Sequence, residues 1–130
     1  MKAPSSKSYI RKAERALAGA RVLLKSGDAD GACNRAYYAM FDAAHAALFA
    51  LQAEDITAPI RTHNGLLAQF GRHVVLAGHL ADVHGEALNK VQRLRQVADY
   101  SGDSVSLADA GWAVEQASAF VAAVRRKISP

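Results

Sequence analysis

The stretch that most constrains how this chain folds is residues 33–48, which contain neither glycine nor proline. Its apolar side chains recur every three or four residues, the spacing of an α-helix. They are Ala32, Ala36, Tyr37, Ala39, Phe41, Ala43, Ala44, Ala47, Leu48, Ala50 and Leu51. A surface helix needs only one apolar stripe, whereas this arc covers more than half of the circumference. The stretch therefore predicts a helix near the centre of the domain, running to about residue 53.

A narrow polar strip remains on this predicted helix. Arg35, Tyr38, Asp42, His45 and Phe49 follow one another at helical spacing, so their side chains line up. Any role of the helix beyond packing should involve this strip. We therefore take its first four members as candidate binding residues.

Four further segments have helical periodicity, and together with the central stretch they predict an all-α fold. The expected helices cover about residues 8–26, 62–77, 80–100 and 107–128, with breaks at 26–28, 54–60, 77–79 and 101–104. Asp28 or Asp30 should cap the central helix and Thr62 the next one. Val83 and Leu107 fall on the apolar seams of the last two helices. Short loops and a length of 130 residues favour one domain over residues 1–130, an up-and-down bundle of about five helices.

The charge of the chain suits a polyanionic or acidic partner. Net charge is +4 and the isoelectric point is about 9.5. One side of the first expected helix carries five cations: Lys7, Arg11, Arg15, Arg21 and Lys25. These cations either follow an RNA phosphate path or form an ordinary solvated face, and both interpretations remain open.

Several classes of site are missing from the sequence. A single cysteine, Cys33, cannot form an intramolecular disulfide or a cysteine-based zinc site. The sequence contains no glycine-rich phosphate loop, no His-Glu-x-x-His motif and no nucleophile elbow. We therefore expect no metal and no cofactor. No apolar run has the length of a membrane span and no signal peptide is evident, so we expect a cytoplasmic protein without membrane contact.

The end of the fourth expected helix holds the most suggestive side chains. Arg95 lies beside the apolar seam, and Asp99 follows one turn later, where the two can pair. Tyr100 comes next, immediately before the break. We take Arg95, Asp99 and Tyr100 as candidate catalytic residues; the alternative is a structural ion pair with a tyrosine at the end of the bundle.

His63 is a further candidate binding residue. It falls in the first turn of the helix that Thr62 is expected to cap. Free backbone N–H groups and the positive end of the helix dipole could hold an anion there. The alternative is a histidine that only caps or packs.

Residues 34–44, Asn-Arg-Ala-Tyr-Tyr-Ala-Met-Phe-Asp-Ala-Ala, resemble the signature of HEPN-domain proteins (higher eukaryotes and prokaryotes nucleotide-binding). The small prokaryotic UPF0332 type is the most similar branch. Residues 61–71 and the Leu-Arg-Gln-Val-Ala-Asp-Tyr run at 94–100 resemble it too, in the expected order. The resemblance covers nearly the whole chain.

This resemblance implies a helical bundle that is usually a homodimer and is often encoded beside a minimal nucleotidyltransferase. Many such pairs act as toxin and antitoxin. Catalytic HEPN domains look like metal-independent endoribonucleases with an arginine, four to six residues, and then a histidine. In that scheme the arginine steadies the scissile phosphate and the histidine moves the 2′-hydroxyl proton.

In this chain Tyr100 stands where that histidine would be, and a phenol with a pKa near 10 is a poor base. Two hypotheses follow. In the first, the protein cuts or binds RNA around Arg95, Asp99 and Tyr100, and the polar strip forms the facing wall of the cleft. In the second, it is a non-catalytic substrate- or nucleotide-binding partner of a nucleotidyltransferase, with Tyr100 as a possible acceptor of a modification.

Overall fold

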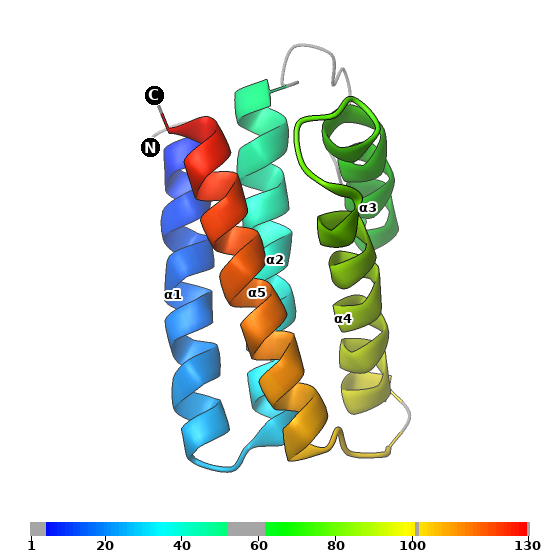
Figure 1. Cartoon of the computed structure of the whole chain (residues 1–130). Coiled ribbons are helices and arrows are strands. Elements are labelled where there is room, and N and C mark those ends of the chain that lie inside the picture. Colours follow the sequence, from blue (N-terminus) through cyan, green and yellow to red (C-terminus); the bar gives the residue numbers. More distant parts are fainter. Residues whose placement is uncertain (1–4, 52–61, 101, 130) are drawn as a thin grey trace.

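The computed structural model describes residues 5–51, 62–100 and 102–129, with Tyr100 described in its backbone only. All five expected helices are present in this part of the chain, and it contains no strand. The elements are α1 (Ser6–Lys25), α2 (Ala29–Leu51), α3 (His63–Phe70), the π-helix η2 (Gly71–Val75), α4 (Asp82–Tyr100) and α5 (Leu107–Ile128). Figure 1 shows them as an up-and-down bundle, with α1 and α5 on one side of α2 and with α3 and α4 on the other. The predicted fold class is confirmed.

Local hydrogen bonds explain where the first two helices begin and end. Ser5 and Ser8 form a reciprocal capping box at the start of α1. Gly27, with φ of +87°, closes that helix in a conformation that favours glycine. The Asp28 side chain then accepts a hydrogen bond from the Gly31 backbone at 2.8 Å. Asp30, the other candidate cap, instead accepts one from the Val105 backbone at 2.8 Å and so ties the segment before α5 to α2.

The third expected helix has a different form from the prediction. Thr62 caps α3 as expected, accepting a hydrogen bond from the Gly65 backbone at 2.9 Å. The α-helix ends at Phe70, however, and the chain continues as η2, in which the Leu76 amide donates to the Gly71 carbonyl at 2.9 Å. This wider turn changes which side chains face the core. Val74 is fully buried, whereas Leu76 is 84% exposed.

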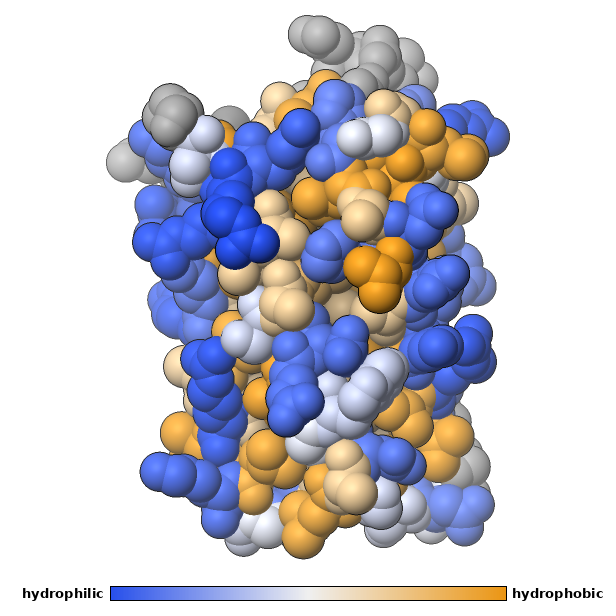
Figure 2. Space-filling view, in the orientation of Figure 1, coloured by the Kyte–Doolittle hydropathy of each residue, from blue (hydrophilic) through white to orange (hydrophobic). Residues whose placement is uncertain are grey.

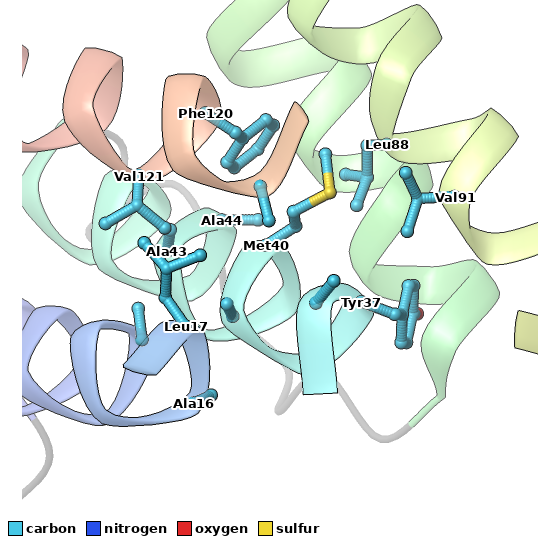
Figure 3. Packing of buried hydrophobic residues seen from close by; sticks show 14 of the residues in the cluster. Ala16, Leu17, Tyr37, Met40, Ala43, Ala44, Leu88, Val91, Phe120 and Val121 are labelled. Atoms are coloured by element: carbon cyan, nitrogen blue, oxygen red, sulfur yellow. The ribbon is translucent and has the colours of Figure 1, made fainter. Parts of the chain in front are cut away.

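The core is built around α2, which contacts every other helical element. Its alanines at 32, 36, 39, 43, 44, 46 and 47 are all buried. In Figure 3, Ala43 lies among Leu17 of α1 and Val121 of α5, while Met40 points toward Leu88 and Val91 of α4. Small side chains allow the backbones to approach closely, and larger ones from the neighbouring helices fill the remaining space. The predicted central position of this helix is confirmed.

Two expected seam residues lie outside the core. Val83 is 57% exposed in the first turn of α4, and Leu107 is 54% exposed as the first residue of α5. Both predictions were wrong. The helical spacing of apolar residues continues to the end of each helix, where no neighbouring helix in the described part of the chain covers it. The buried side of α4 consists of Ala87, Leu88 and Val91, and it also includes the polar residues Gln92 and Arg95.

Hydrophilic side chains line the flanks of the bundle in Figure 2, and apolar side chains gather where η2 joins α4. All five cations of the α1 stripe are exposed. One of them, Arg21, donates a hydrogen bond to Ser118 of α5 at 3.0 Å. None of the helices in the described ranges combines the length and the apolar character that a membrane span requires.

Candidate functional site

Arg95 is buried, with 5% of its side chain exposed, and among the described residues no other cationic side chain is. Its Nη1 lies 3.1 Å from Oδ2 of Asp99, one turn further along α4. Its Cζ lies 4.7 Å from the ring centroid of Tyr37 and 6.0 Å from that of Tyr38. The expected pairing of Arg95 with Asp99 is present. Burial of the charge is offset by the carboxylate and by the π faces of the two tyrosines.

Two amides tie this part of α4 to its neighbours. Asn34 of α2 donates a hydrogen bond to Oδ2 of Asp99 at 3.3 Å. Gln92, buried on α4, reaches Oδ1 of Asn64 on α3 at 3.5 Å. The Asp99 carboxylate therefore receives one cationic and one neutral donor and joins α2 to α4, while Gln92 joins α4 to α3.

His63 is held against the same tyrosine as Arg95. The Tyr37 hydroxyl and Nδ1 of His63 are 2.7 Å apart, and the two rings stack with centroids 5.4 Å apart and planes inclined by 20°. Tyr38 meets the imidazole edge-on at 5.7 Å, and the Phe41 centroid lies at 4.8 Å. Thr62 sets this position, since its cap makes His63 the first residue of α3.

The electrostatics of these two rings fix their protonation near neutral pH. Burial, reinforced by the positive charge of Arg95, lowers the pKa of His63 below its ordinary value of 6.5. Burial raises the pKa of the Tyr37 phenol well above 10. A neutral imidazole is therefore hydrogen-bonded to a protonated phenol, an arrangement in which the phenol can donate to Nδ1 and leave the proton of the imidazole on Nε2.

We call the group formed by Asn34, Tyr37, Tyr38, His63, Arg95 and Asp99 the Tyr37 cluster. Arg35 lies at its rim, with Cζ 5.9 Å from the Tyr38 centroid, and is exposed. The structure thus brings together five of the sequence-derived candidates: Arg35, Tyr38, His63, Arg95 and Asp99. Tyr37 and Asn34 were not among those candidates.

Two further members of the polar strip, Asp42 and His45, lie toward α1. The His45 ring stacks on Tyr9 of α1, with centroids 4.8 Å apart and planes inclined by 10°. Burial lowers the pKa of His45 and raises that of Asp42, the latter opposed by the charges of Lys12 and Arg35. The strip therefore divides: its first part adjoins Arg95, and its second part belongs to the contact between α1 and α2.

The remaining candidate is Tyr100, the last residue of α4, whose side chain lies outside the described residues. Burial raises the pKa of the Cys33 thiol to about 11, with further contributions from the charges of Asp99 and Asp30, so this thiol is not a nucleophile at neutral pH. Within residues 5–51, 62–100 and 102–129, no group of three or more His, Cys, Asp and Glu side chains could hold a metal ion.

The sequence as a whole matches a known domain family. The family model of the HEPN domain matches residues 6–127 of the chain. The chain therefore belongs to the HEPN domain family.

Individual relatives define the branch. A UPF0332 protein of Gloeobacter violaceus is 34% identical over 76% of this chain and 75% of its own length. A UPF0332 protein of Thermotoga maritima is 33% identical over 71% of this chain and 66% of its own. A protein of Methanocaldococcus jannaschii, named as a candidate toxin, is 28% identical over 93% of this chain and 87% of its own. The chain belongs to the UPF0332 branch of the family.

Proposed function

We propose that this protein is the toxin-type HEPN member of a pair with a minimal nucleotidyltransferase, acting in the cytoplasm as a homodimer that binds or cleaves RNA. The observation that carries the proposal is the Tyr37 cluster, in which Arg95 and His63 lie against one tyrosine ring. The similarity to the candidate toxin of Methanocaldococcus jannaschii extends over 93% of the chain and supports the same class of function.

The chemistry of Arg95 is suited to a phosphate group. A guanidinium forms two parallel hydrogen bonds to phosphate oxygens and stays charged at every physiological pH. Because the Arg95 side chain is only 5% exposed, an RNA phosphate reaches it by taking the place of the Asp99 carboxylate, which is 28% exposed. Arg35 at the rim and the net charge of +4 favour the approach of the polyanion.

The test is binding and cleavage of single-stranded RNA by wild-type protein and by Arg95→Ala and Arg95→Lys variants. We expect Arg95→Ala to weaken RNA binding about 10- to 100-fold, the worth of a charge-assisted hydrogen bond. Arg95→Lys keeps the charge beside Asp99 and should retain the fold but lose the paired hydrogen bonds. The matched control is Arg125→Ala, which removes an exposed arginine paired with Glu14 on another face. Equal losses in the Arg95 and Arg125 variants would contradict the assignment.

A second candidate function is that Tyr100 accepts a modification from the nucleotidyltransferase. Its position favours this: Tyr100 ends α4, directly after the Asp99 that pairs with Arg95. Modification of a phenol adds bulk and charge, and this would block the binding of RNA. Mass spectrometry of protein co-expressed with the product of an adjacent nucleotidyltransferase gene should find added mass on Tyr100 and none on a Tyr100→Phe variant. An unmodified Tyr100 and no stable complex would exclude this role.

A further inference from the structure

We propose that His63 is the catalytic residue that moves the 2′-hydroxyl proton of RNA, in the role left open by Tyr100, and that Tyr37 is its positioning residue. This inference rests on the proposed action on RNA and deepens it. It names the substrate class as RNA with a free 2′-hydroxyl, and it assigns a proton-transfer group on α3 instead of α4.

The contacts of the His63 imidazole are those expected for a general base that is fixed in position. One ring nitrogen, Nδ1, is engaged by the Tyr37 hydroxyl at 2.7 Å, and we assign the other, Nε2, to the substrate. Stacking on Tyr37 and edge contact with Tyr38 restrict the ring to one orientation. His63 is partly exposed, whereas Tyr37 is fully buried, so the phenol supports the imidazole from the protein side. This is how a buried hydrogen-bonding partner orients a catalytic histidine.

Among residues 5–51, 62–100 and 102–129, the charged and titratable groups that face His63 come from two helices. Tyr37 and Tyr38 face it from α2, and Arg95 of α4 acts on it as a positive charge. Burial and that charge lower the pKa of His63, so the ring is neutral at physiological pH and able to accept a proton. Cζ of Arg95 lies 4.7 Å from the centroid of the Tyr37 ring, on which His63 stacks. Arg95, which would bind the phosphate, and His63, which would accept the proton, therefore pack against the same tyrosine.

The other histidines with described ring contacts occupy different surroundings. His45 is stacked on Tyr9 at the contact between α1 and α2. His84 meets Phe120 of α5 edge-on at 6.1 Å, where Arg126 is the neighbouring charge. Of these three histidines, His63 is the one that shares a tyrosine ring with Arg95.

The step is a transesterification within one RNA strand. Nε2 of His63 takes the proton of the 2′-hydroxyl, and the 2′-oxygen forms a new bond to the adjacent phosphorus. The bond from phosphorus to the 5′-oxygen breaks, and the leaving 5′-oxygen takes a proton from water. The products are a 2′,3′-cyclic phosphate and a 5′-hydroxyl, and protonated His63 returns its proton to solvent. Arg95 stabilises the charge that develops on the phosphate oxygens.

The experiment measures cleavage of an end-labelled, mixed-sequence single-stranded RNA and its fully 2′-O-methylated counterpart from pH 5 to 9. The proteins are wild type, His63→Gln, His63→Ala and Tyr37→Phe, each shown to be folded by circular dichroism and thermal melting. His84→Gln is the matched control, since it changes a partly buried histidine away from the Tyr37 cluster. Binding of both RNAs is measured in parallel by electrophoretic mobility shift.

We expect His63→Gln to reduce cleavage by about 10²- to 10⁴-fold while RNA binding changes little. Added imidazole should restore part of the activity of His63→Ala, an effect that a merely structural role of the ring would not produce. Tyr37→Phe should lower the rate and move the rising limb of the pH profile, and His84→Gln should match the wild type. The 2′-O-methylated RNA should bind and remain intact.

Cleavage by His63→Gln at the wild-type rate would overturn the inference and leave the proposed action on RNA standing. Binding without any cleavage by the wild type would overturn it too, and would retain only the binding form of the proposed function. If the wild type neither binds nor cleaves RNA, the proposed function itself fails. Cleavage of the 2′-O-methylated RNA would exclude the 2′-hydroxyl as the nucleophile and so overturn the inference.

Discussion

The two sides of α2 are built on different physical principles. Toward α1 and α5 it presents alanines, which the neighbouring helices cover with Leu17 and Val121 (Figure 3). Toward α3 and α4 it presents Tyr37 and Tyr38, which hold a cation and an imidazole. Around these alanines, size alone decides which side chains fit. On the second side each group needs a partner of particular charge and hydrogen-bonding capacity.

This difference separates what holds the bundle together from what it can do. The alanines contribute stability through close packing and dispersion, and an alanine carries no ionisable group that could take part in chemistry. The tyrosine side buries Arg95, whose removal from water costs free energy that Asp99 and the rings offset. Substitutions among the alanines should therefore change stability alone. Substitutions on the tyrosine side should change both stability and the binding or cleavage of RNA.

The largest effect is expected for Ala43→Leu, on the alanine side. Ala43 is fully buried, so three additional carbon atoms must displace α1 or α5. Overpacking of this kind costs about 1–3 kcal/mol and more where the backbone cannot move. Urea unfolding followed by circular dichroism gives the change. The control is Ala18→Leu, an exposed position in α1 that should change stability by less than about 0.5 kcal/mol. Equal effects at the two positions would show that α2 is not closely packed.

Helical periodicity predicted most of this fold from the sequence because five segments repeat apolar residues at the same spacing. It was wrong where that spacing continues beyond the packed region, at Val83 and Leu107, and it did not predict η2. A π-helix depends on which hydrogen bond forms when Phe70 and Val74 both pack inward, and this is decided by tertiary contacts.

For the site, the pairing of Arg95 with Asp99 was predictable because both lie on one helix, four residues apart. The contact of Tyr37 with His63 could not be predicted, because the two residues are 26 positions apart and meet only where α3 lies beside α2. One signal was available. Tyr37 lies within the apolar arc, and a buried phenol has to find a hydrogen-bond partner.

The second largest effect is expected for Asp99→Ala on the tyrosine side. It leaves the buried Arg95 charge without its carboxylate, which costs about 3–5 kcal/mol in a fully buried pair. Because Asp99 is 28% exposed, water compensates in part, and we expect about 2 kcal/mol. Glu14→Ala breaks the other ion pair, with Arg125, whose side chains are 41% and 64% exposed; we expect less than about 1 kcal/mol. Thermal unfolding of the two variants measures the difference, and a smaller loss for Asp99→Ala than for Glu14→Ala would contradict it.

A smaller effect is expected for Tyr37→Phe, which keeps the ring under Arg95 and removes only the hydroxyl. The lost hydrogen bond to His63 should cost about 0.5–1.5 kcal/mol in chemical denaturation. Tyr38→Phe is the matched control, on the adjacent and partly exposed ring. We expect it to change stability less than Tyr37→Phe. The reverse order would show that the phenol of Tyr37 does not hold the imidazole.

The smallest effect concerns pH and compares one histidine from each region. Burial lowers the pKa of both His45, against α1, and His63, in the Tyr37 cluster, below 6.5. Between 6.5 and these lower values the unfolded chain binds more protons than the folded one, so stability falls as pH falls through that range. His45→Gln and His63→Gln should each reduce the stability difference between pH 7.5 and pH 5.5, and the effect should be small because both rings are partly exposed to screening water. Urea unfolding at the two pH values measures this difference. Only His63→Gln should also change RNA cleavage, so a loss of cleavage in His45→Gln would mean that the α1 side of α2 takes part in the chemistry.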